Sequence, residues 1–196
     1  ACAGLLLDRA ASLPLVTVLG ATLVLGLGYT APPLKFAWRG LGELDVGLTH
    51  SLVVILFGHL LQGGAWSDPF PWLVSAPLFV AVLPAIILSG VPDLEADRQA
   101  GKATLVVRLG APRAMLLAAV LAVVAAGLVL LLKDLAALRG SFDGLLAGAL
   151  PHALLLGVML YRYWQRGTPA GRIDGLMTVA LGYILWFVLV PLTHLW

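Results

Sequence analysis

Long apolar runs alternate with short polar segments along the chain. Six runs contain no Lys, Arg, Asp or Glu, and each is long enough to cross a bilayer as a helix, which takes about 17–25 residues. Their apolar residues are continuous rather than alternating, which favours helices over β-strands. We therefore expect an all-α bundle of six transmembrane helices, forming one domain over residues 1–196. The runs are residues 10–34, 46–67, 69–92, 114–132, 145–161 and 176–196.

The composition indicates lipid as the solvent for most of this surface. Hydrophobic residues make up 61% of the chain and charged residues 11%, against about 25% charged in ordinary globular proteins. We therefore expect a multi-pass integral membrane protein. The 12 Lys and Arg residues are too scattered for a nucleic-acid surface. The sequence does not indicate an oligomeric state.

Charge asymmetry predicts the orientation. If the six runs alternate in direction, residues 30–43, 93–113 and 162–174 share one face of the membrane. Nine of the 12 basic residues lie there, so by the positive-inside rule we expect this face to be cytoplasmic, in a cell inner or plasma membrane. The nine are Lys35, Arg39, Arg98, Lys102, Arg108, Arg113, Arg162, Arg166 and Arg172.

One segment on this face, the acidic loop (residues 91–104), has the residues for metal and phosphate chemistry. Asp93 and Asp97 are four apart, so on a helical turn both carboxylates project from one face. Such a pair repels unless a cation lies between them, and Mg²⁺ commonly binds through one or two carboxylates plus substrate phosphates. Arg98 and Lys102 are suited to holding phosphate oxygens. The segment predicts a metal–diphosphate site, although paired charges in a solvated loop explain the spacing equally well.

A second segment, the aromatic loop (residues 28–43), follows the first apolar run, which a Pro-Pro pair ends. Lys35 and Arg39 are expected on the same face as the acidic loop. Tyr29 and Trp38 offer π faces that stabilise cations. Taken alone, this segment is better interpreted as an interfacial aromatic belt with snorkelling cations.

Taken together, the two segments resemble the UbiA superfamily of intramembrane prenyltransferases. The run PDLEADRQAGKATLVVRLG is similar to the superfamily's second aspartate-rich motif. The run YTAPPLKFAWRGLGELDVGL is similar to the loop between its fourth and fifth helices, most of all in the 1,4-dihydroxy-2-naphthoate polyprenyltransferase branch. The resemblance covers essentially the whole chain, and it implies that the six runs are the last six of nine helices.

The resemblance implies a reaction and its residues. A polyprenyl group passes from an isoprenyl diphosphate to an aromatic acceptor, with Mg²⁺ as cofactor. In the naphthoate branch the acceptor is the quinone precursor 1,4-dihydroxy-2-naphthoate, in menaquinone biosynthesis. Asp93 and Asp97 would be the catalytic metal ligands, and Glu43 is a weaker candidate that pairs with Arg39. The implied contacts to the diphosphate and its allylic end are Tyr29, Lys35, Arg39, Arg98 and Lys102.

The sequence also departs from the family pattern. A first aspartate-rich motif, Asn-x-x-x-Asp-x-x-x-Asp in type, has no counterpart here. We therefore expect that the amino-terminal part is missing and that this chain alone is inactive. Homogentisate, hydroxybenzoate and tetrapyrrole acceptors stay open. The alternatives to a prenyltransferase are a membrane transporter and a phosphotransferase acting on alcohol head groups. Carboxylates confined to loops and helix ends disfavour the first, and the absence of a longer aspartate series disfavours the second.

Overall fold

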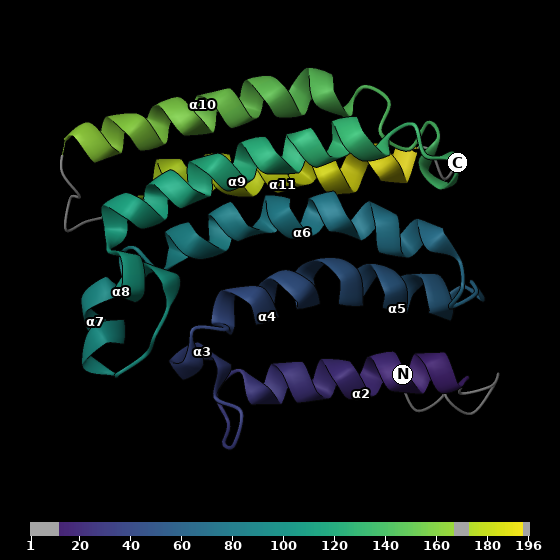
Figure 1. The fold of residues 1–196 in the computed structure, drawn as a ribbon, viewed down its shortest axis with the longest axis horizontal. Helices are drawn as coiled ribbons and strands as arrows, with labels where there is room; N and C mark the ends of the chain where they lie inside the picture. Colours follow the sequence, from purple (N-terminus) through teal and green to yellow (C-terminus); the bar gives the residue numbers. More distant parts are fainter. Residues whose placement is uncertain (1–11, 167–172, 194–196) are drawn as a thin grey trace.

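The computed structural model describes residues 12–166 and 173–193, and this part of the chain is helical without a strand. Five of its helices are long and apolar enough to cross a membrane (Figure 1). The first consists of α4 (Gly42–Leu48), a π-helical turn η1 (Thr49–Val53) and α5 (Val54–Leu61). The others are α6 (Pro69–Ser89), α9 (Ala111–Leu132), α10 (Leu145–Gln165) and α11 (Asp174–Thr193). The predicted helical membrane bundle is confirmed.

The first predicted span forms α2 (Leu13–Gly28), which is apolar but only 16 residues long. Residues 10–11 of that run lie outside the described residues. The helix begins where the Ser12 hydroxyl accepts a hydrogen bond from the backbone N–H of Leu15 at 3.4 Å. In the same way the Asp68 carboxylate accepts from Phe70 N–H at 2.9 Å, just ahead of α6. Both are N-caps followed by a proline in the first turn, a standard start signal for a helix.

The second span begins earlier than its apolar run. We predicted a start at Val46, but the helix begins at Gly42 and includes Glu43 and Asp45 in its first turn. Negative side chains are favourable there because the amino-terminal end of a helix dipole is positive. The predicted boundary was therefore wrong in a way that matters for the site, because it left two buried carboxylates outside the helix.

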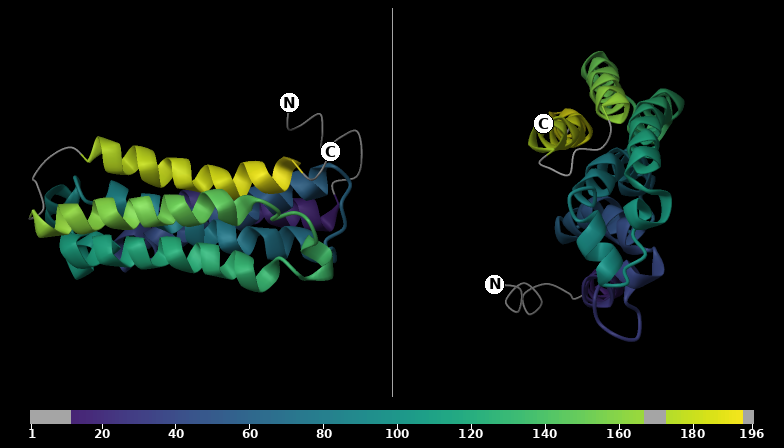
Figure 2. Two further views of the ribbon diagram at one scale, coloured as in Figure 1. Left: turned by 90° about the horizontal axis from the view of Figure 1, so that it is seen from above. Right: turned by 90° about the vertical axis from the view of Figure 1, so that its left-hand side faces the viewer.

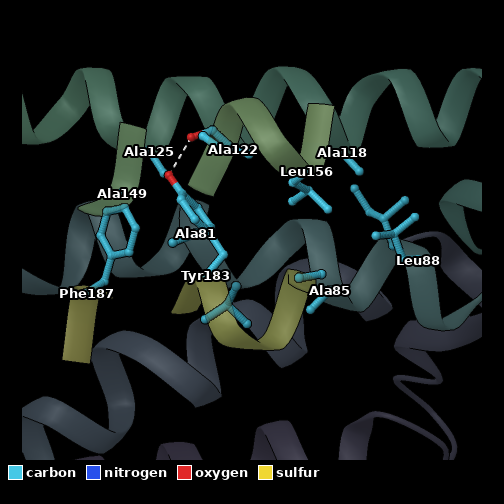
Figure 3. Packing of buried hydrophobic residues seen from close by; sticks show 14 of the residues in the cluster. Ala81, Ala85, Leu88, Ala118, Ala122, Ala125, Ala149, Leu156, Tyr183 and Phe187 are labelled. Atoms are coloured by element: carbon cyan, nitrogen blue, oxygen red, sulfur yellow. Dashed lines mark hydrogen bonds between the residues drawn. The ribbon is translucent and has the colours of Figure 1, made fainter. Parts of the chain in front are cut away.

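Alanine is the most frequent residue of the main hydrophobic core. α6 contacts α9 and α11, and α10 also contacts α9 and α11, so these four helices form one packed group. Alanines on facing helices let the backbones approach closely. The Tyr183 ring fills the remaining space, and its hydroxyl donates to the carbonyl oxygen of Ala122 at 2.6 Å (Figure 3). The buried alanines of these helices include Ala81, Ala85, Ala118, Ala122, Ala125 and Ala149.

The remaining helices extend from one side of this group. The α4–α5 span packs on α6, and α2 packs on α5, so the end-on view is elongated, with α2 at one edge (Figure 2). Large apolar side chains cover the outward faces, among them Leu116, Leu154 and Leu181. Such surfaces are stable only against hydrocarbon. The protein is therefore an integral membrane protein.

The short helices gather at one end of the bundle. They are α3 (Phe36–Arg39), α7 (Leu94–Gln99) and α8 (Leu105–Leu109), and all lie at the left in Figure 1. A further short turn, η2 (Ala136–Leu138), lies in the connection between α9 and α10. The acidic and aromatic loops therefore meet at one end of the bundle, as the alternation of the runs predicts.

Candidate active site

The acidic loop follows directly from the end of α6. Gly90 ends α6, and Asp93 occupies the N-cap position of α7 without using its side chain as a cap. Its carboxylate therefore stays available to a ligand. The backbone N–H of Asp97 donates to the carbonyl of Asp93 at 2.8 Å, which closes one helical turn. This turn places both carboxylates on one pocket, as their spacing predicts.

Asp97 is paired with a lysine inside the same loop. The Lys102 ammonium donates to Asp97 Oδ1 at 2.6 Å, and Asp97 is only 8% exposed. Gly101 turns the chain back between them with a φ of 69°, a left-handed conformation that favours glycine. The hydrogen bond to Asp97 raises the pKa of Lys102, more than burial lowers it. Lys102 is therefore a permanent cation at neutral pH.

The aromatic loop is bound to the acidic loop by backbone and side-chain contacts. The Trp38 indole donates to the carbonyl of Ala100 at 3.1 Å, and the N–H of Ala103 donates to the carbonyl of Ala37 at 3.2 Å. Gly40 makes this approach possible, because a Cβ there would lie 3.0 Å from the carbonyl oxygen of Ala103. Segments about sixty residues apart in sequence thus form one hydrogen-bonded unit.

Glu43 fixes this unit to the membrane-spanning part. Its Oε1 accepts from the backbone N–H of Leu105 at 2.6 Å, so a side chain of α4 caps the start of α8. The predicted pairing with Arg39 is wrong, since the Arg39 guanidinium donates to the carbonyl of Pro33 at 2.8 Å. The second oxygen of Glu43 is buried and has no hydrogen-bond partner in the described part of the chain. Asp45, two residues further along α4, also has one such oxygen.

These side chains surround a pocket of about 120 Å³ between α4, the end of α6 and the acidic loop. Three carboxylates and one ammonium line it, which leaves an excess of two negative charges. The pocket is smaller than the ~300–1,000 Å³ of ordinary small-molecule sites, so it suits a compact charged group. Its lining residues are Tyr29, Gly42, Glu43, Ile86, Ser89, Gly90, Asp93, Asp97, Lys102 and Thr104.

The predicted site residues divide into two sets. Four of them line the pocket: Tyr29, Asp93, Asp97 and Lys102. The other three do not line it. The Lys35 ammonium lies 5.6 Å from the centre of the Trp38 ring, which Lys102 also approaches at 5.9 Å. Arg39 is held at Pro33, and Arg98 forms an exposed ion pair with Glu95 at 3.0 Å.

Sequence reasoning gave too little weight to Glu43, and it missed Thr104 and Ser89. Thr104 is the N-cap of α8, where its hydroxyl accepts from Val107 N–H at 3.4 Å. The Thr residue ahead of an apolar stretch is a recognisable cap signal, but its place in the pocket follows from the contact between α4 and α8. The contact between α4 and α8 joins residues far apart in the sequence, so no local sequence pattern predicts it.

The fold and the pocket define a class of protein: a helical membrane protein with an acidic, lysine-containing pocket at one end of its bundle. Comparison with known families agrees with this class. The chain belongs to the UbiA prenyltransferase family, whose model matches residues 1–177. No solved structure matches the chain.

Two curated relatives are similar over part of their length. A 2-carboxy-1,4-naphthoquinone phytyltransferase from Synechocystis sp. is 35% identical over 108 residues, which are 52% of this chain and 33% of that protein. A UbiA prenyltransferase domain-containing protein 1 from Dictyostelium discoideum is 28% identical over 87 residues, 44% of this chain and 26% of that protein. The chain thus spans about a third or less of the relatives it matches.

Proposed function

We propose that this chain contributes the diphosphate-binding half of a prenyltransferase site. The reaction breaks the allylic C–O bond of an isoprenyl diphosphate and joins the polyprenyl group to an aromatic acceptor. The observation that carries the proposal is the pocket itself, in which Asp93, Asp97 and Lys102 face one another beside Tyr29. Family membership supports the same chemistry.

The pocket fits a divalent cation such as Mg²⁺. Its excess of two negative charges and the unpartnered oxygen of Glu43 call for a positive group. Asp93 and Asp97 would hold the ion through hard carboxylate oxygens. In the described residues no group of three or more His, Cys, Asp or Glu is placed to hold a metal without help. An ion held by Asp93 and Asp97 would be shared with substrate phosphates, and it would supply positive charge to the departing diphosphate.

The other pocket residues have separate roles in this proposal. Lys102 lines the pocket and contacts phosphate oxygens as a point charge. The Tyr29 ring borders the pocket and offers its π face to the allylic end of the substrate. The isoprenoid tail is too apolar for water and lies along the membrane-facing helices. Arg39, Lys35 and Arg98 reach the diphosphate only by changing the partners they have in this structure.

A naphthoate-type acceptor is the substrate we propose, and quinone biosynthesis, as in menaquinone, is the corresponding process. The name of the Synechocystis relative specifies a naphthoquinone. The aromatic loop resembles the same branch. We also propose that the pocket end faces the cytoplasm, because most of the basic residues lie there.

The proposal is tested with the full-length protein and Asp93→Ala. Mg²⁺-dependent binding of a prenyl diphosphate is measured by equilibrium dialysis in detergent. We expect Asp93→Ala to weaken binding by roughly tenfold or more, the loss typical of perturbed metal sites. Glu95→Ala is the matched control, since Glu95 lies on the same helix but is exposed and paired with Arg98. Equal losses in both variants, or unchanged binding in Asp93→Ala, would refute the proposal.

A further inference from the structure

A groove separate from the acidic pocket runs between α9 and α10. Its volume is about 530 Å³, and its walls are apolar. Ala119 of α9 and Gly157 of α10 line its deeper part, where small side chains leave room between the helices. A Cβ added at Gly157 would meet no atom within 4 Å, which confirms open space at that position. The groove therefore offers room for a hydrocarbon chain.

One end of the groove is polar. Arg113, in the first turn of α9, lines it together with Tyr161 and Trp164 near the end of α10. The two aromatic rings stack with their centres 5.8 Å apart and are each 56% exposed. Tyr and Trp concentrate at the level of lipid head groups. The groove therefore runs from head-group level into the hydrocarbon, about 9 Å from Arg113 to Ala119 at the helical rise of ~1.5 Å per residue.

The cation at the mouth has no ion-pair partner within the described part of the chain. Arg113 makes no ion pair or hydrogen bond with a described residue. Nor do Arg162 and Arg166 make an ion pair there, although they lie at the same end of α10. The positive amino-terminal end of the α9 dipole adds to this field. A guanidinium that no described residue pairs with, above an apolar groove, is complementary to an anionic head group with an attached acyl chain.

We propose that this groove binds an anionic phospholipid. Arg113 contacts the phosphate, Tyr161 and Trp164 flank the head group, and one acyl chain lies against Ala119 and Gly157. An uncharged hydrocarbon occupant, such as an isoprenoid tail, would fill the groove but would leave Arg113 unpaired. Charge complementarity therefore favours the phospholipid.

Native mass spectrometry of the full-length protein tests the proposal with phosphatidylglycerol and phosphatidylcholine of identical chains. We expect phosphatidylglycerol to be retained about fivefold better, the ratio that corresponds to ~1 kcal/mol per surface cation. Arg113→Gln should abolish this preference. Arg166→Gln, a matched cation that does not line the groove, should keep it. Gly157→Leu, which fills the groove, should weaken retention of both lipids.

Several outcomes would overturn the proposal. Equal retention of the two lipids by the unmodified protein would show that the groove does not select an anionic head group. This comparison needs no variant. A preference that survives Arg113→Gln, or that Arg166→Gln reduces equally, indicates diffuse surface charge instead of a site. Displacement of the lipid by a short isoprenyl diphosphate assigns the groove to the substrate. Thermal unfolding of each variant shows that a loss of binding is not a loss of folding.

Discussion

Replacing Glu43 separates its two roles, because its carboxylate both caps α8 and adds a negative charge to the lining of the acidic pocket. Glu43→Ala removes the acceptor for Leu105 N–H. Hydrogen bonds to charged groups contribute about 1.5–3 kcal/mol, so we expect the free energy of unfolding to fall by about 2 kcal/mol. In Glu43→Gln the amide oxygen still accepts from Leu105. A neutral acceptor is roughly half as strong, so we expect a loss of about 1 kcal/mol.

The charge of Glu43 is tested by ligand binding in the same variants. Glu43→Gln removes one of three carboxylates from a pocket that holds a single lysine. Half-maximal binding of a prenyl diphosphate should therefore need a higher Mg²⁺ concentration, even though Asp93 and Asp97 remain. Glu95→Ala should leave this concentration unchanged, since Glu95 is exposed and does not line the pocket.

The assay is reversible unfolding of the full-length protein in mixed micelles, followed by Mg²⁺ titrations of the folded variants. Equal destabilisation by Glu43→Ala and Glu43→Gln would show that the bond to Leu105 does not stabilise the loop. An unchanged Mg²⁺ requirement in Glu43→Gln would show that the excess negative charge does not attract the ion. The two results are independent, so either part of the reasoning can fail by itself.

Lys102 and Tyr183 give further tests, as does the isolated chain. The Asp97 hydrogen bond raises the pKa of Lys102 above 10.5. The stabilisation by the Lys102–Asp97 pair is therefore complete below pH 10.5 and is lost as the pH rises through the raised pKa. Diphosphate binding should thus show no Lys102-dependent loss up to about pH 10, and a loss below pH 10 that Lys102→Met abolishes contradicts this. Tyr183→Phe should lower the free energy of unfolding by about 0.6–1.7 kcal/mol, the range for hydrogen bonds between membrane helices, while the exposed control Tyr161→Phe should have little effect. The isolated 196-residue chain should show no turnover with Mg²⁺ and both substrates, because the first aspartate-rich motif of the family pattern has no counterpart in its sequence. Robust turnover in a prenyl-transfer assay contradicts this.

Five of the six predicted spans form helices long enough to cross a membrane, and the first forms the shorter α2. These spans and the shared end of the two loops could be predicted because both follow from local hydrophobicity and alternation. Hydrocarbon excludes charged residues, so the uncharged runs mark the helices that cross it. The amino-terminal bound of the second span was wrong because Glu43 and Asp45 were assumed to stay outside the helix. Both are instead 6% exposed. The helix dipole, and for Glu43 the N–H of Leu105, compensate part of the cost of burying them.

The sequence by itself determined the class of protein, the end of the bundle where charge collects and the one-turn spacing of Asp93 and Asp97. These are properties of single segments in a low-dielectric solvent. Only the tertiary structure decided which charged groups share the pocket. Arg98 is adjacent to Asp97 in sequence but pairs with Glu95, whereas Glu43 reaches Leu105 across 62 positions. Helix direction and packing set such partners, because a turn of helix sends neighbouring side chains to different faces.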